Sequence, residues 1–178
     1  MSAYDPHSWA EFGVAAAGAA AVLAGLVFVA VSINLEKVLE IRGLPGRAGE
    51  SIIMFLGALI ASLLLLVPGQ SNTALGVELA GSGATLAVGL ILIAWPGLKY
   101  QAHHPLSWRI TRIVAALATS VPIAVAGVSL LAESGGGLYW LLAAVVLAFI
   151  AGIGNAWVLL VEVVRDERYR PIAESERP

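Results

Sequence analysis

The sequence has no cysteine and few charged residues. Without cysteine, the chain of 178 residues can form no disulfide, no thiolate metal site and no cysteine nucleophile. Charged residues make up 12% of the chain and hydrophobic residues 59%, whereas roughly a quarter of a soluble domain is charged. This composition excludes a soluble globular domain and predicts one compact membrane domain.

Lysine and arginine are missing from the N-terminal segment and from every second connection between the long apolar runs. Because basic residues near helix ends mark the cytoplasmic side of a membrane, this alternation predicts five transmembrane helices, with the N-terminus outside and the C-terminus in the cytoplasm. The predicted location is the plasma (inner) membrane, crossed several times. The ten basic residues lie in three segments: Lys37, Arg42 and Arg47; Lys99, Arg109 and Arg112; and Arg165, Arg168, Arg170 and Arg177.

The apolar runs predict an all-α bundle with spans at about residues 12–35, 50–67, 73–95, 108–132 and 138–164. They belong to one domain of residues 1–170, and we expect residues 171–178 to form a disordered tail. Apolar spacing after Leu35 predicts that the first helix continues about two turns into the cytoplasm, until GLPG ends it. Pro122 should kink the fourth helix, where the Thr119 and Ser120 hydroxyls can help to satisfy the freed carbonyls.

Glu78 is the one acid well inside an apolar run, about five residues into the third span. A carboxylate is costly in lipid, so it should face protein or water. One interpretation is a cation or proton position at the outer mouth of a hydrated path, continued at helical spacing by Ser82 and Thr85. The other is an acid among the lipid headgroups, followed by a small-residue stripe with Gly81 and Gly89 that packs against another helix.

Two asparagines invite the same two interpretations. Asn155 in the fifth span aligns with Gly152 and Glu162 on one helix face. It either lines a pathway or makes an interhelical hydrogen bond, with Gly152 as a packing position. Asn34, at the inner end of the first span, is the second such residue.

The first span is unusually rich in small residues, in the string GVAAAGAAAVLAG. Gly18, Ala21 and Gly25 share overlapping faces, and small residues let helix backbones approach closely in lipid. The pattern predicts a helix that is central in the fold or in an oligomer. A pore lining is the alternative use of the same residues.

The sequence contains no catalytic constellation. Phosphate-binding loops, nucleophile elbows, paired glycosidase acids and zincin motifs are missing, and so is a compact basic patch for nucleic acid. His103 and His104 form the one histidine pair, with no third metal ligand nearby in the sequence. We therefore expect no enzyme, no cofactor and no bound metal.

The string WAEFGVAAAGAAAVLAGLVFVAVSINLEKVL, followed by GLPGRA, resembles the opening of a family of small, uncharacterised bacterial membrane proteins. Some of its members are labelled as modulators of a membrane-anchored ATP-dependent protease. The resemblance covers Trp9 to Ala48 and assigns no functional residues.

Two functions therefore remain open. The first is association within the bilayer, as a homo-oligomer or as a structural or regulatory partner of a larger membrane complex. The second is an oligomeric channel with Glu78 at its outer mouth. A membrane enzyme acting on lipid headgroups through the histidine pair is the remaining hypothesis.

Overall fold

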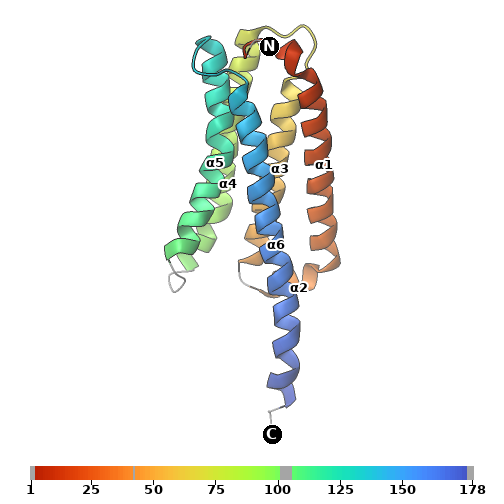
Figure 1. Ribbon diagram of the computed structural model, residues 1–178. Coiled ribbons are helices and arrows are strands. Elements are labelled where there is room, and N and C mark those ends of the chain that lie inside the picture. The colour runs from red at the N-terminus through yellow and green to blue at the C-terminus, as the bar shows by residue number, and fades with distance from the viewer. Residues whose placement is uncertain (1–2, 42, 101–105, 176–178) are drawn as a thin grey trace.

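The computed structural model describes residues 3–41, 43–100 and 106–175, which fold into a long helical bundle (Figure 1). A short 3-10 helix, η1, precedes the first long helix. Five helices are long and apolar enough to cross a membrane, so the prediction of an all-α chain with five candidate spans is confirmed. The elements are η1 (Pro6–Trp9), α1 (Ala10–Ile33), α2 (Leu35–Glu40), α3 (Leu44–Leu64), α4 (Asn72–Tyr100), α5 (Leu106–Leu131) and α6 (Tyr139–Ser175).

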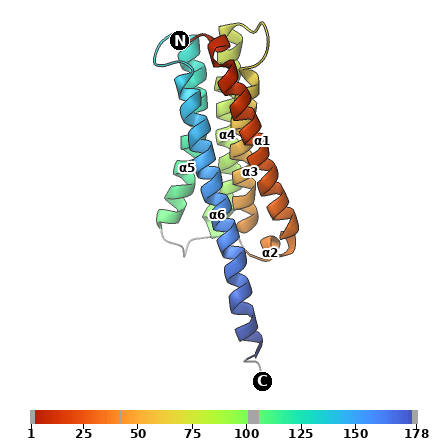
Figure 2. The same ribbon diagram turned by 45° about the vertical axis from the view of Figure 1, so that its right-hand side comes forward.

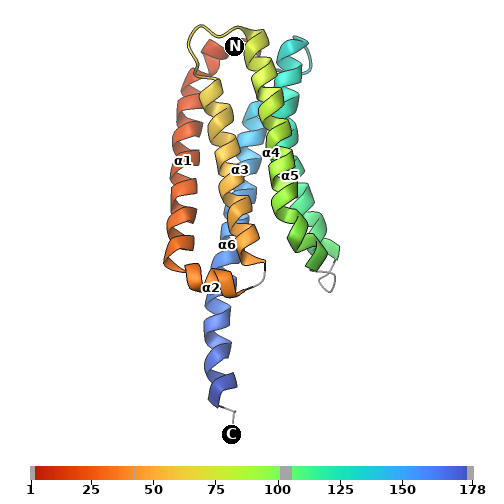
Figure 3. The ribbon, with the colours of Figure 1, turned by 180° about the vertical axis from the view of Figure 1, so that it is seen from behind.

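Helix α3 is the centre of the bundle. It packs against α1, α4 and α6, and α5 completes the bundle by packing against α4 and α6. Its buried positions recur at helical spacing, from Leu44 through Ser51 and Ala58 to Leu65, which is the pattern of a helix with one wide face in the core. Figures 1 and 3 show α1 at one side of the bundle, with the α4–α5 hairpin at the other.

We call the end of the bundle that carries η1 the upper end and the end that carries α2 the lower end, as in Figure 1. At the upper end, the backbone N–H of Leu138 donates to the carbonyl of Ala3 at 2.9 Å. Asn72 Nδ2 donates to the carbonyl of Tyr4 at 2.9 Å. The N-terminal segment thus joins the starts of α4 and α6. At the other end, α6 projects well below the other helices (Figure 2).

The lower end of α1 differs from the expected straight projection. The helix stops at Ile33, and α2 turns underneath the bundle. The turn buries Val38 against Leu44, Ala48 and Leu159, whereas a straight helix would leave this apolar side chain outside the fold. Burial of Val38 therefore explains the break at Asn34, whose Nδ2 donates back to the carbonyl of Ala30 at 2.9 Å.

The GLPG string begins α3 as well as ending the preceding segment. Gly43 adopts a left-handed φ of 92° before the helix, and Pro45 occupies its first turn, where a missing N–H costs nothing. As a result α3 starts at Leu44, about six residues before the expected start of the span, and Arg47 and Glu50 lie on it.

Two further helices differ in detail from the expectation. Helix α5 runs through Pro122, and Thr119 and Ser120 both donate to the carbonyl of Ala116. Proline frees the carbonyl four residues before it, which is that of Ala118, so these hydroxyls bind a different carbonyl from the expected one. Helix α6 continues to Ser175, past the start of the expected disordered tail.

Glycine permits close contacts between α4 and α5. A Cβ built on Gly83 of α4 would lie 2.5 Å from the backbone nitrogen of Ala124 on α5. One built on Gly127 of α5 would lie 2.4 Å from the backbone nitrogen of Ala80. Helices α4 and α5 therefore touch backbone to backbone, as small residues allow in membrane proteins.

Candidate functional site

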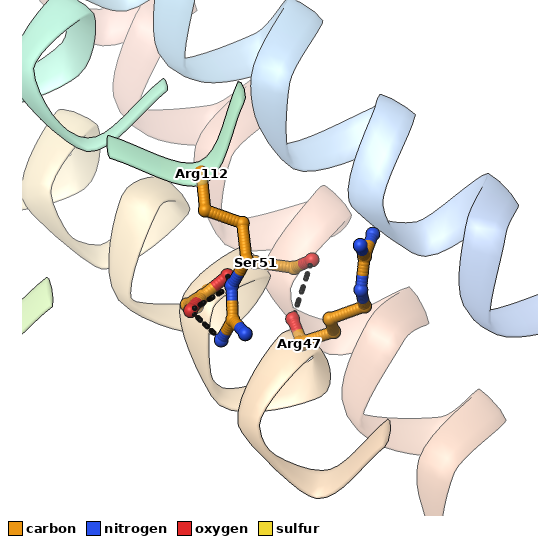
Figure 4. A network of polar contacts seen from close by, with 4 residues as sticks. Arg47, Ser51 and Arg112 are labelled. Atoms are coloured by element: carbon orange, nitrogen blue, oxygen red, sulfur yellow. Dashed lines mark hydrogen bonds and ion pairs between the residues drawn. The ribbon is translucent and has the colours of Figure 1, made fainter. Parts of the chain in front are cut away.

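A buried ion pair links α3 and α5 near the lower end of the bundle. Arg112 Nε donates to the Glu50 carboxylate at 3.0 and 3.3 Å, and Nη2 forms a further short contact with Oε1 (Figure 4). The Arg112 side chain is 3% exposed and that of Glu50 is 4% exposed. The pair connects two helices that make few other contacts with each other.

Arg47 extends this pair into a cluster of four charged residues. It lies one helical turn before Glu50 and is 8% exposed. Its guanidinium group interacts favourably with Glu50 and with Glu162 of α6, and unfavourably with Arg112. Burying charges is costly unless opposite charges and hydrogen bonds compensate. The cluster balances its charges with two arginines and two glutamates drawn from three helices.

One polar atom within the cluster is buried without a partner. Arg112 Nη1 has no hydrogen bond among the described residues, although Nε and Nη2 both bind Glu50. In Figure 4 the arginine plane presents this third nitrogen on the side where Arg47 lies. An unsatisfied N–H of a charged group is expensive, and it therefore marks a place where an acceptor would stabilise the structure.

A cavity of about 410 Å³ lies beside the cluster, between α5 and α6. Its polar lining consists of Arg47, Thr111, Arg112 and Asn155. The apolar lining comes from both helices: Ala115, Ile150, Ala151, Gly154 and Val158. Neither glutamate of the cluster lines the cavity, so among the described residues the charged side chains on its wall are basic.

Glu78 lies far from this cluster, on the outward face of α4 near the upper end. It is exposed, and its carboxylate accepts a short hydrogen bond from Gln70 Nε2. Thr85 is also exposed, and its hydroxyl donates to the carbonyl of Gly81. Ser82 is half-buried and donates to the carbonyl of Leu79. These three polar side chains therefore lie along α4 without forming an enclosed site within one chain.

The two asparagines lie apart from Glu78 in the fold. Asn155 lies on α6, about 24 Å along the helix from its start at Tyr139, given 1.5 Å of rise per residue. Asn34 lies at the lower end of α1, where its side chain bonds to its own helix. A single chain thus brings together Asn155 and the arginines, and it leaves Glu78 and Asn34 apart from both.

The six small residues expected at helix contacts divide into two groups. Gly152 lies against Phe55, since a Cβ there would come within 2.5 Å of the phenyl ring. A Cβ on Gly18, Gly25, Gly81 or Gly89 would meet no neighbour within 4 Å, and Ala21 is exposed. Five of the six therefore lie where the chain itself provides no close partner.

The buried cluster is the feature that sequence reasoning missed. Arg47 and Arg112 counted only as markers of membrane orientation, and Glu50 as the start of a span. A signal was available, because Arg112 follows Ile110 into the apolar run of the fourth span and a buried charge needs a partner. The partner of Arg112 could not be identified from the sequence, because Glu50 lies 62 positions away in the chain.

Metal binding receives no support from the part of the chain that the structure describes, because it has no group of three or more His, Asp or Glu side chains placed to hold an ion. The pair His103 and His104 lies outside the described residues.

Comparisons with protein-family models, with curated proteins and with solved structures give no match to this chain.

Proposed function

We propose that this protein is a non-enzymatic, multi-pass protein of the plasma (inner) membrane that works by associating with further copies of itself through the outward face of α1. Its N-terminus lies outside and its C-terminus in the cytoplasm, in agreement with the distribution of basic residues. We also propose membership of the small bacterial membrane proteins that the segment from Trp9 to Ala48 resembles. That segment contains the whole of α1.

The open backbone at Gly18 and Gly25 is the observation on which the proposal rests. Wherever α4 and α5 cross closely, glycines such as Gly83 and Gly127 lie at the contact. Gly18, Ala21 and Gly25 offer the same close approach along one face of α1, where a side chain would meet nothing. In lipid, which is as apolar as the helix surface, such packing is a main source of helix association.

Helix α1 is also the least enclosed of the spans. Only 22% of its most apolar stretch is buried, compared with 50% for α3 and α5. Its inner face already uses small residues, because Ala16 and Ala20 share a buried cluster with Ala58 and Ala61 of α3. On the outer face, Gly18 and Gly25 meet no neighbour among the described residues and lie beside exposed large side chains such as Val22. An identical α1 from a second copy would complement this face.

The position of α1 favours association over conduction. The candidate path residues lie in three separate places: Glu78 on α4, Asn155 on α6 and Asn34 between α1 and α2. The open face of α1, in contrast, contains no charged residue between Gly18 and Gly25. An interface between packed helices needs only an uncharged surface such as this face of α1.

The oligomeric state of the purified full-length protein in mild detergent, measured by light scattering, tests the proposal. Wild-type protein should have the mass of two or more copies, and Gly18→Leu combined with Gly25→Leu should reduce it to one. The matched control, Gly81→Leu, alters an equally open glycine on α4 and should keep the wild-type mass. A monomeric wild type, or a double variant that stays oligomeric, would contradict the proposal.

A further inference from the structure

The residues that line the cavity between α5 and α6 follow an order from the lower to the upper end of the bundle. Helix α5 rises from the lower end, so Thr111 and Arg112 precede Ala115, which lies higher. Helix α6 descends, so Ile150 and Ala151 lie above Asn155. The cavity is therefore basic below on the side of α3 and α5 and apolar above, with Val158 of α6 as one apolar residue below Asn155.

This order matches that of a phospholipid in one leaflet. Arg112 is the last charged residue before the apolar run of residues 113–131 in α5, a position that corresponds to the headgroup boundary at the lower end of the span. The open side of the cavity is bordered by the exposed residues Ile150 and Gly154. Acyl chains could therefore leave the cavity upward along α5 and α6 while the headgroup stays among the polar side chains.

The polar wall has the donors that a phosphate diester needs. Arginine binds phosphate oxygens with a planar set of N–H groups, and Arg47 and Arg112 line the cavity together with Thr111 and Asn155. Arg47 and Arg112 repel each other, so a negative charge between them would lower their mutual energy. Arg112 Nη1 is buried and lacks an acceptor among the described residues, so this arginine keeps one N–H group that Glu50 does not bind.

The two glutamates of the cluster do not cancel this attraction. Glu50 binds the Nε and Nη2 edge of Arg112, and Glu162 interacts with Arg47, yet neither carboxylate lines the cavity. The charged side chains that line the cavity among the described residues are therefore donors, and Glu50 binds Arg112 outside that lining. Basic pockets between transmembrane helices are a recognised way of binding anionic lipid headgroups.

From these observations we infer that the cavity is a binding site for the phosphate headgroup of an anionic phospholipid. Its volume of about 410 Å³ lies within the range of small-molecule pockets, roughly 300–1,000 Å³. The inference is independent of self-association, because the cavity is lined by α3, α5 and α6 and by no residue of α1.

The test uses full-length protein in mild detergent, with added phosphatidylglycerol, phosphatidylcholine of the same acyl chains, or inorganic phosphate. Bound lipid is counted by native mass spectrometry, and the melting temperature is followed in parallel. Phosphatidylglycerol should bind and raise the melting temperature at concentrations where the other two do neither. Equal effects of the two lipids would overturn the assignment to an anionic headgroup, since both contain a phosphate diester and only their net charge differs. An equal effect of inorganic phosphate would overturn the lipid assignment in favour of the free anion.

Variants then locate the site. Arg47→Gln should weaken phosphatidylglycerol binding by about tenfold or more, since it removes charged hydrogen bonds, while Lys37→Gln removes a base of α2 outside the cavity and should not. Gly154→Leu leaves all charges intact and fills open space in the cavity. It should also abolish the effect, whereas Gly89→Leu, in open space on α4, should preserve it. If the Arg47→Gln and Gly154→Leu variants both bound phosphatidylglycerol as tightly as the wild type, this cavity would not be the binding site.

Discussion

Nε of Arg112 lies 3.0 Å from a carboxylate oxygen of Glu50, and both side chains are almost completely buried. This contact ties α5 to α3 at the lower end, where few other contacts join these helices. The α4–α5 hairpin is thus held to the centre of the bundle by this ionic link and by the packing of α4 against α3 and of α5 against α6.

Removing one member of this pair should be strongly destabilising. Glu50→Ala leaves Arg112 charged and buried, which costs about 3–5 kcal/mol in the free energy of unfolding. Unfolding of the detergent-solubilised protein by denaturant measures the loss. Glu36→Ala, at an exposed acid of α2, is the control and should change stability by less than about 0.5 kcal/mol.

Removing both charges should restore much of that loss. A buried pair replaced by apolar residues of similar size is often neutral or stabilising, so Glu50→Leu with Arg112→Met should be more stable than either single variant. A double variant whose loss equals the sum of the two single losses would mean that the residues do not interact, contrary to the structure.

The contact between α4 and α5 predicts a different sensitivity. Gly127→Ala places a methyl group 2.4 Å from the backbone of Ala80, so the helices must separate, at a cost of about 1–3 kcal/mol. Gly89→Ala, which meets no neighbour, should instead stabilise α4 by up to about 1 kcal/mol through helix propensity. In denaturant unfolding, Gly127→Ala should have a lower free energy of unfolding than the wild type, and Gly89→Ala a higher one. Equal effects of the two substitutions would count against this packing.

The proposed orientation can be tested because the chain has no native cysteine. Ser71→Cys and Ser134→Cys place a thiol at the upper end, and Glu40→Cys places one at the lower end, all at exposed positions. A membrane-impermeant maleimide applied to intact cells should label the first two, and should label Glu40→Cys only after permeabilisation. Labelling of Glu40→Cys from outside would reverse the topology.

The sequence predicts the five candidate spans because apolar runs such as GVAAAGAAAVLAG can be read locally. It does not predict the bend at Asn34, since Leu35, Val38 and Leu39 continue the helical spacing and only tertiary burial of Val38 opposes it. Nor does it predict that Glu50 meets Arg112. Which faces of α3 and α5 meet depends on helix order and rotation, and neither is encoded in the spacing of residues along one helix.

The same limit explains the small residues of α1. Their spacing predicts a packing face but leaves open whether the partner is α3 or another molecule. In the structure Ala16 and Ala20 face α3, whereas Gly18, Ala21 and Gly25 face outward.

Disulfide cross-linking in native membranes tests self-association through α1 most directly. A disulfide requires Cα atoms within about 7 Å, so Ala21→Cys should give a dimer on oxidation if two α1 helices cross there. Ala84→Cys, an exposed position on α4, should not. Adding Gly18→Leu and Gly25→Leu to Ala21→Cys should remove the cross-link. No dimer from Ala21→Cys, or an equal yield from Ala84→Cys, would contradict association through this face.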